Sequence, residues 1–177
     1  MTVQTDTTTL PTAEEIAASL DWRGRSGEVV PGADAAHHLE AVRSLLDKRG
    51  WSRTVGSGSD EEETEDGTHP LAGADESWTV KRLLLGLIRA VVEEMSWTPA
   101  PPTLNGALDA VSRTADGDAD TETVAGRCIE AVLRLRTGAR YPSLIAWSGK
   151  RGRTYEEICE VLTEAAAFAR THGPAVA

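Results

Sequence analysis

The sequence predicts an all-α fold, a compact bundle of about six helices with a long acidic loop and a disordered N-terminal tail. Apolar residues recur every three or four positions, the spacing that places them on one face of a helix. Thr12–Glu15 and Thr154–Glu157 both have the Thr-x-x-Glu pattern of a capping box at a helix start. Ala, Leu and Val dominate the apolar residues and there is a single Phe, which favours helices over sheets.

The N-terminal end is predicted to be a tail followed by a short helix. Residues 1–11 are rich in Thr and form the predicted disordered tail. The capping box at Thr12 then starts a helix that runs to about Leu20, with Ile16 on its apolar face.

A glycine-containing loop over 21–32 separates this helix from a longer one. Asp34 is predicted to cap that helix, which covers about 35–49. Gly50 ends it, because glycine is the residue most often found just past a helix C-terminus.

Residues 52–76 are predicted to be a flexible acidic insertion within a single helical domain over 12–174. The segment Asp60–Glu76 holds eight acidic residues and neither Lys nor Arg. Such a composition buries too little apolar surface to order itself. Most of the formal net charge of −10 therefore lies in this one segment.

The strongest helical pattern covers Trp78–Met95, after Ser77 as the predicted cap. Its apolar residues surround so much of the helix that we expect it to lie at the centre of the bundle. Gly86 inside it suggests a close approach of another backbone.

Three further helices are predicted in the C-terminal half. Thr103 caps the first, which ends before a polar loop over 114–120. Asp120 or Thr121 caps the second, which runs to about Thr137. The last helix starts at the second capping box and ends near Arg170; the apolar stretch Tyr141–Trp147 fits a helical turn or a strand equally well.

Composition limits the classes of function. A net charge of −10 favours solubility and disfavours non-specific adhesion to nucleic acid or anionic membranes. The sequence has no apolar run of roughly 18 residues and no secretory signal pattern at its beginning, so we expect a cytoplasmic protein without a membrane role. The two cysteines, Cys128 and Cys159, are expected to be reduced and inert.

No metal site, cofactor site or catalytic motif is predicted. His37 and His38 are adjacent and point about 100° apart on a helix, and no pair of His or Cys residues has the spacing of zinc ligands. The acids of Asp116–Asp120 lack the glycine and glutamate that a calcium loop needs at fixed offsets. Each group has a structural explanation that needs no ligand.

The most informative feature is a basic segment in an acidic chain. Residues 127–153 hold seven Lys and Arg residues and one acid, Glu130. Surface tryptophans are frequent interface anchors, and cations beside them suit phosphates or acidic partners. The predicted partner-binding residues combine these two features: Trp22, Arg140, Trp147, Lys150, Arg151 and Arg153.

Three segments also resemble a known family. His38–Trp51 reads HLEAVRSLLDKRGW, Leu83–Ala90 reads LLLGLIRA, and Ile145–Arg170 reads IAWSGKRGRTYEEICEVLTEAAAFAR. Together they resemble a family of small actinobacterial proteins that is catalogued as a domain of unknown function, over about residues 37–170. The family usually has Asn-Asp where this chain has Ser148-Gly149, a departure that argues against an enzyme. The resemblance implies no activity.

The leading hypothesis is a non-enzymatic cytoplasmic interaction or regulatory protein that binds a protein partner. One alternative is a nucleic-acid-binding protein that uses Arg140 and Lys150–Arg153. The other is an enzyme of unknown reaction, with a pocket built from residues such as Asp34, His38 and Cys128. The sequence leaves the oligomeric state open.

Overall fold

A computed structural model describes residues 11–54 and 100–175. These residues form helices and, apart from one isolated bridge between Arg23 and Val29, no β-structure, which confirms the predicted all-α fold. The described helices are α1 (Ala13–Ser19), α2 (Gly32–Arg49), α4 (Leu104–Ser112), α5 (Ala119–Thr137), α6 (Leu144–Ser148) and α7 (Tyr155–His172). The predicted tail, nearly all of the acidic insertion and the predicted Trp78–Met95 helix lie outside the described residues.

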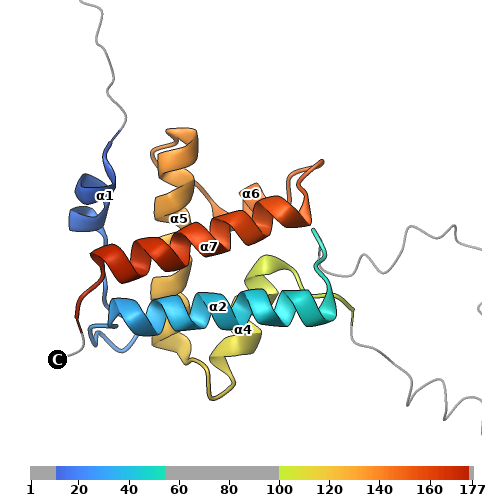
Figure 1. Ribbon diagram of the computed structural model, residues 1–177, viewed down its shortest axis with the longest axis horizontal. Coiled ribbons are helices and arrows are strands. Elements are labelled where there is room, and N and C mark those ends of the chain that lie inside the picture. Colours follow the sequence, from blue (N-terminus) through green and yellow to red (C-terminus); the bar gives the residue numbers. More distant parts are fainter. Residues whose placement is uncertain (1–10, 55–99, 176–177) are drawn as a thin grey trace, which may run out of the picture. The chain divides into compact units, whose positions relative to one another are not determined.

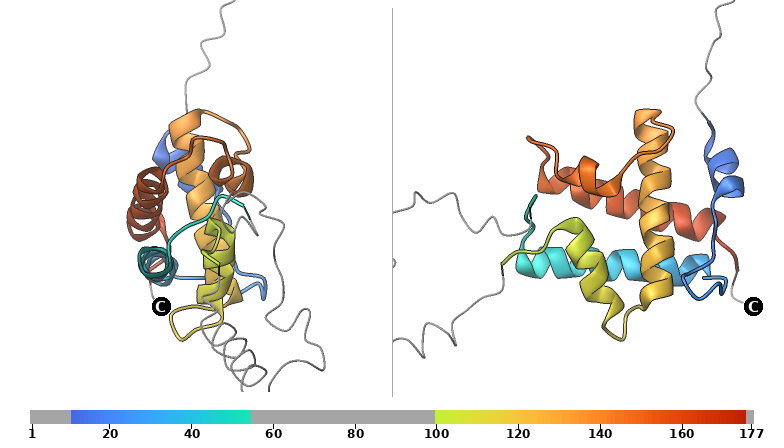
Figure 2. Two further views of the ribbon diagram at one scale, coloured as in Figure 1. Left: turned by 90° about the vertical axis from the view of Figure 1, so that its right-hand side faces the viewer. Right: turned by 180° about the vertical axis from the view of Figure 1, so that it is seen from behind.

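The most extensive contact between two helices joins α2 and α7, which lie side by side and run in opposite directions (Figure 1). Behind this pair, α5 crosses both helices, and α4 lies beside α5 (Figure 2). The short α6 packs against α4 and α5 on the side away from α2 and α7. The bundle therefore has a layer of two long helices on one side of α5 and short elements on the other.

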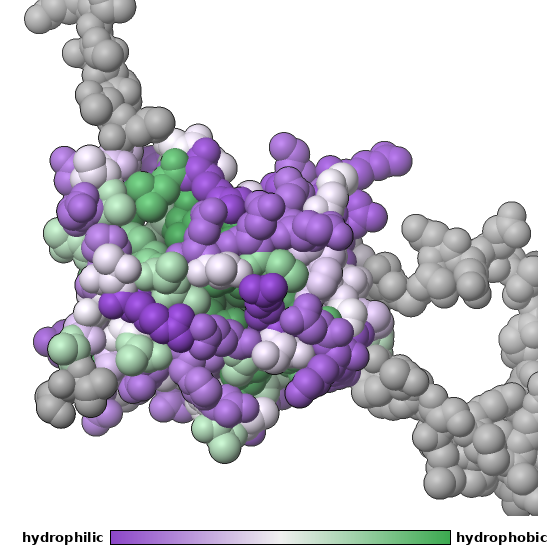
Figure 3. Space-filling view, in the orientation of Figure 1, coloured by the Kyte–Doolittle hydropathy of each residue, from purple (hydrophilic) through white to green (hydrophobic). Residues whose placement is uncertain are grey.

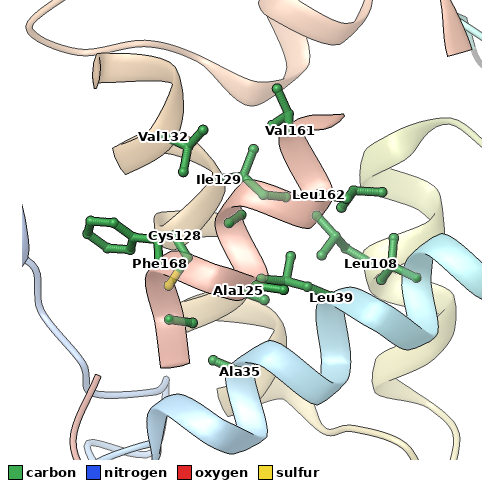
Figure 4. Packing of buried hydrophobic residues seen from close by; sticks show 14 of the residues in the cluster. Ala35, Leu39, Leu108, Ala125, Cys128, Ile129, Val132, Val161, Leu162 and Phe168 are labelled. Atoms are coloured by element: carbon green, nitrogen blue, oxygen red, sulfur yellow. The ribbon is translucent and has the colours of Figure 1, made fainter. Parts of the chain in front are cut away.

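The core fills the space between these layers. Apolar side chains from α2, α5 and α7 converge there, as Leu39, Ile129 and Leu162 show in Figure 4. Burying one such side chain stabilises the fold by about 1.5–3 kcal/mol relative to leaving it in water. The largest side chains that are fully buried come from α2, α4, α5 and α7: Leu39, Leu46, Leu104, Ile129, Leu133, Ile158 and Leu162.

Local sequence determines several helix starts. Both predicted capping boxes are formed: the Glu15 amide donates to Thr12 Oγ1 at 3.3 Å, and the Glu157 amide donates to Thr154 Oγ1 at 3.3 Å. Thr103 likewise accepts from the Gly106 amide at the start of α4. These caps satisfy amides that the first turn of a helix leaves without a partner.

Two predicted caps are wrong. Pro31 stands at the N-cap of α2, so that Asp34 lies inside the first turn instead of before it. The N-cap of α5 is Asp118, whose side chain accepts from the Asp120 and Thr121 amides at 3.0 and 2.8 Å. Both helices therefore begin earlier than the sequence pattern predicts.

The segment Tyr141–Trp147, which the sequence left between helix and strand, contributes to a helix. It forms most of α6, and Ser143 caps that helix by accepting from the Ala146 amide at 3.3 Å.

Candidate functional site

The α6 region carries the two most exposed large apolar side chains of the described residues. Tyr141 is 82 % exposed and Ile145 is 65 % exposed. Leu144 and Ser148, four residues apart on the other side of α6, are buried against the bundle. Because neighbouring helix residues point about 100° apart, burial of Leu144 turns Ile145 outward.

Trp147, on α6, and Arg153, in the loop after it, contact each other directly. The Arg153 guanidinium lies 3.9 Å from the centre of the Trp147 ring, and its Nε donates to the Trp147 carbonyl at 3.3 Å. The same guanidinium forms an ion pair with Glu157 at 2.8 Å, and its side chain is only 13 % exposed. Arg153 thus fixes the loop between α6 and α7, with little of its side chain left for a partner.

Three other predicted cations face solvent. Arg140, Lys150 and Arg151 are exposed, and in the described part of the chain no carboxylate lies within ion-pair distance of them. The Arg140 guanidinium lies 5.3 Å from the centre of the Tyr141 ring. We call the set Arg140, Tyr141, Ile145, Lys150 and Arg151 the α6 surface.

Trp22 has a different environment. It is half-buried, and its ring stacks on Phe168 of α7 with 6.5 Å between ring centres and 13° between planes. The Trp22 carbonyl accepts from the Val30 amide at 2.8 Å. Trp22 therefore closes the core beneath the loop between α1 and α2, and no contact links it to the α6 surface.

Three hollows surround the α6 surface. The first, of about 450 Å³, lies between α1, α5 and the loop that precedes α6, and Arg140 and Tyr141 line it. The other two, of about 320 and 360 Å³, share Ile145 and Asn105 in their walls. The sequence does not single out Tyr141 and Ile145 as binding residues, because without the start of α6 the pattern does not tell which side of the segment is buried.

A family model, described as a family of unknown function (DUF6197), matches residues 30–168. The chain belongs to the DUF6197 family. The match runs from just before α2 through most of α7 and includes the whole α6 surface, whereas α1 lies outside it. Neither a curated protein nor a solved structure matches this DUF6197 chain.

The residues suggested for an enzyme are not arranged for catalysis in this DUF6197 domain. His38 is fully buried, with Nε2 3.2 Å from the Leu108 carbonyl and Nδ1 3.3 Å from Thr121 Oγ1, so protein groups occupy both ring nitrogens. Burial raises the pKa of the Cys128 thiol to about 12, which keeps it protonated. Asp34 is exposed at the start of α2.

The acidic side chains just before α5 and in its first turn form contacts within the DUF6197 domain. Asp116 pairs with His37 at 3.4 Å, Asp118 caps α5, and Asp120 accepts from the Ser26 amide at 2.9 Å. Over residues 11–54 and 100–175, no three His, Cys, Asp or Glu side chains are grouped as metal ligands. None of the described helices has the length and apolar character needed to cross a membrane.

Proposed function

We propose that this DUF6197 protein is a non-enzymatic binding protein whose α6 surface docks a protein partner. The observation that carries the proposal is the exposure of Tyr141, in the loop before α6, and of Ile145, on α6, beside three hollows. Apart from Val29, at 51 %, the described residues expose no other large apolar side chain to this extent. Tyrosine is enriched among residues that dominate the binding energy of protein interfaces.

The charges of the α6 surface favour a partner that presents an acidic and apolar segment. Arg140 lies next to Tyr141, and Lys150 and Arg151 follow α6 in the loop. Cations at the rim of an interface increase the association rate with an acidic partner and disfavour basic ones. Trp22, Trp147 and Arg153 support this role from within, since they hold the loops in place.

We place this role in the cytoplasm and consider it regulatory. Both cysteines are free, as is usual in a reducing compartment. A small domain with a binding surface of this kind acts through the partner that it engages.

Removing the apolar anchors tests the proposal. The full-length chain with Tyr141→Ala and Ile145→Ala is expected to lose about 2 kcal/mol or more of binding free energy, about thirtyfold in affinity, for a partner first isolated with the wild type. Both side chains are exposed, so the far-ultraviolet circular dichroism and the melting temperature should stay the same. Affinity is measured by calorimetry with the purified partner.

The matched control is Val29→Ala, which removes an exposed apolar side chain from the loop between α1 and α2. It is expected to leave the affinity unchanged. Equal affinities for the double variant and the control would show that the α6 surface does not bind the partner.

A further inference from the structure

We infer that the hollow between α1, α5 and the loop before α6 binds a small organic carboxylate with an apolar body. This site goes beyond the proposed function, because Arg134 and Ile16, which line it, are not part of the α6 surface. The inference rests on three features of the hollow: its size, its apolar wall and the state of its charged groups.

The hollow has the size and lining of a ligand site. Its volume is about 450 Å³, within the range of roughly 300–1,000 Å³ that small-molecule pockets occupy. Ile16 and Leu20 come from α1 and its end, and Ala131 comes from α5, so hydrocarbon lines one side. Figure 3 shows the opposite face of the bundle, where α2 and α7 lie in front, so the lining of the hollow is known from its residues alone.

One of the three arginines in the wall, Arg127, is already bound by other groups of the protein. Arg127 Nη1 donates to the carbonyls of Asp21 and Arg23 at 2.7 and 2.6 Å and lies 3.4 Å from the Asp21 carboxylate. These contacts tie the end of α1 and the following loop to α5. Arg127 is therefore part of the frame of the hollow, and its charge is balanced by Asp21.

The other two arginines, Arg134 and Arg140, form no ion pair in the described part of the chain, although the Arg140 guanidinium lies over the Tyr141 ring. Among the described residues, no carboxylate lies within 4.0 Å of Arg134 or Arg140, although both line the same hollow. Glu130, one helical turn before Arg134, is the remaining charged group of the wall. A guanidinium binds a carboxylate through two parallel hydrogen bonds, which is the contact that these side chains lack.

The balance of charges selects a singly charged ligand. Arg134 and Arg140 together with Glu130 leave one positive charge, and Asp21 and Arg127 cancel. A doubly charged phosphate would meet Glu130 and Asp21, and it has no apolar part to lie against the partly exposed Leu20. A ligand with one carboxylate and an apolar or aromatic body matches both the single positive charge and the apolar wall, and it can contact the Tyr141 ring.

Phenylacetate, which joins a carboxylate to an aromatic ring, is a suitable probe. Phenylacetamide is the control that keeps the ring and removes the negative charge, and inorganic phosphate is the control that has negative charge and no ring. We expect saturable changes in the amide resonances of Ile16, Leu20 and Ala131 when phenylacetate is titrated into the ¹⁵N-labelled full-length chain. Phenylacetamide and phosphate should produce much smaller changes. Equal changes with phosphate, or none that saturate with phenylacetate, would overturn the inference.

Two variants locate the ligand. Arg134→Gln is expected to weaken phenylacetate binding about tenfold or more, the effect of a lost charge-assisted hydrogen bond, and the exposed Arg140→Gln should act in the same direction. The matched control is Arg151→Gln, with the same change of charge on the α6 surface. If both variants bind phenylacetate as the control does, the site is elsewhere.

Failure of this site and failure of the proposed function can be told apart. Arg134→Gln alters the hollow but no residue of the α6 surface, so partner affinity should be unchanged. Conversely, Ile145→Ala alters the α6 surface but does not line the hollow, and phenylacetate should bind as before.

Discussion

At the scale of a single residue, His38 joins three parts of the bundle. It extends from α2, and its ring lies between the Leu108 carbonyl of α4 and Thr121 of α5. A side chain at Gly117 would collide with the ring, since a Cβ there would lie 2.2 Å from His38 Nδ1. The His38 side chain is fully buried. Its hydrogen-bond partners could not be predicted, because they come from distant parts of the chain.

The buried ring predicts how stability depends on pH. Burial lowers the pKa of His38 below its ordinary value of 6.5, although the Leu108 carbonyl and the nearby Glu122 and Asp118 act in the opposite direction. His38 is therefore protonated near pH 6.5 in the unfolded chain, and only at a lower pH in the folded chain. The free energy of unfolding should fall as the pH drops below about 6.5, and above that this residue should have no effect.

Urea unfolding at a series of pH values between about 5 and 8 measures this dependence. His38→Leu should be less stable at every pH, but its stability should change less below pH 6.5 than that of the wild type. His37→Asn, which alters the exposed neighbour, should retain the wild-type dependence. Parallel curves for the wild type and His38→Leu would contradict the role of the ring.

At the scale of elements, the start of α2 depends on the end of α7. The Gly32 amide donates to the Pro174 carbonyl at 2.9 Å, and the backbones of Gly32 and Gly173 are in contact. This contact explains why the prediction of Asp34 as a cap was wrong. Capping boxes involve residues three apart and are visible in sequence, whereas the beginning of α2 is set by residues at the other end of the domain.

Two helical glycines with different surroundings, Gly32 at the start of α2 and Gly126 inside α5, provide a test. A Cβ at Gly32 would lie 2.2 Å from the Ala169 carbonyl oxygen, a backbone atom that cannot move alone, whereas a Cβ at Gly126 of α5 meets nothing within 4 Å. Gly32→Ala should destabilise the protein by about 1–3 kcal/mol through overpacking. Gly126→Ala should stabilise it by about 0.5–1 kcal/mol, because alanine is the better helix former.

Denaturant unfolding of both variants beside the wild type gives the two values. Gly126→Ala shows the effect of alanine at a helix position where nothing obstructs the added side chain. A Gly32→Ala variant at least as stable as the wild type would mean that α2 and α7 do not approach as closely as described.

At the scale of the whole molecule, the sequence predicts the fold class and the inner face of most helices, because periodicity is a local signal. It does not predict that α2 and α7 form one layer with α5 across them, which depends on packing between distant segments. The same limit applies to the site. Arg140, Lys150 and Arg151 are exposed as a binding role requires, whereas Trp22 and Arg153 are engaged by Phe168 and Glu157.

The distribution of charge predicts weak or no binding to nucleic acid. The net charge is −10, and several cations of the basic segment are used within the fold: Arg127 by Asp21, Arg136 by Glu164 and Arg153 by Glu157. The anisotropy of a labelled single-stranded oligonucleotide should not change on titration with the protein at about 0.2 M salt. Tight binding that weakens steeply between about 50 and 200 mM salt would instead support direct contact with phosphates.

The arrangement of the helices around α5 separates two kinds of evolutionary constraint. A substitution within the layer of α2 and α7 acts on long helices that bury many side chains, so most changes there reduce stability. On the other side of α5, short helices and loops present exposed positions such as 141 and 145, where most changes leave the core intact. If the α6 surface binds a partner as proposed, its specificity can therefore change without loss of the scaffold that the other side maintains.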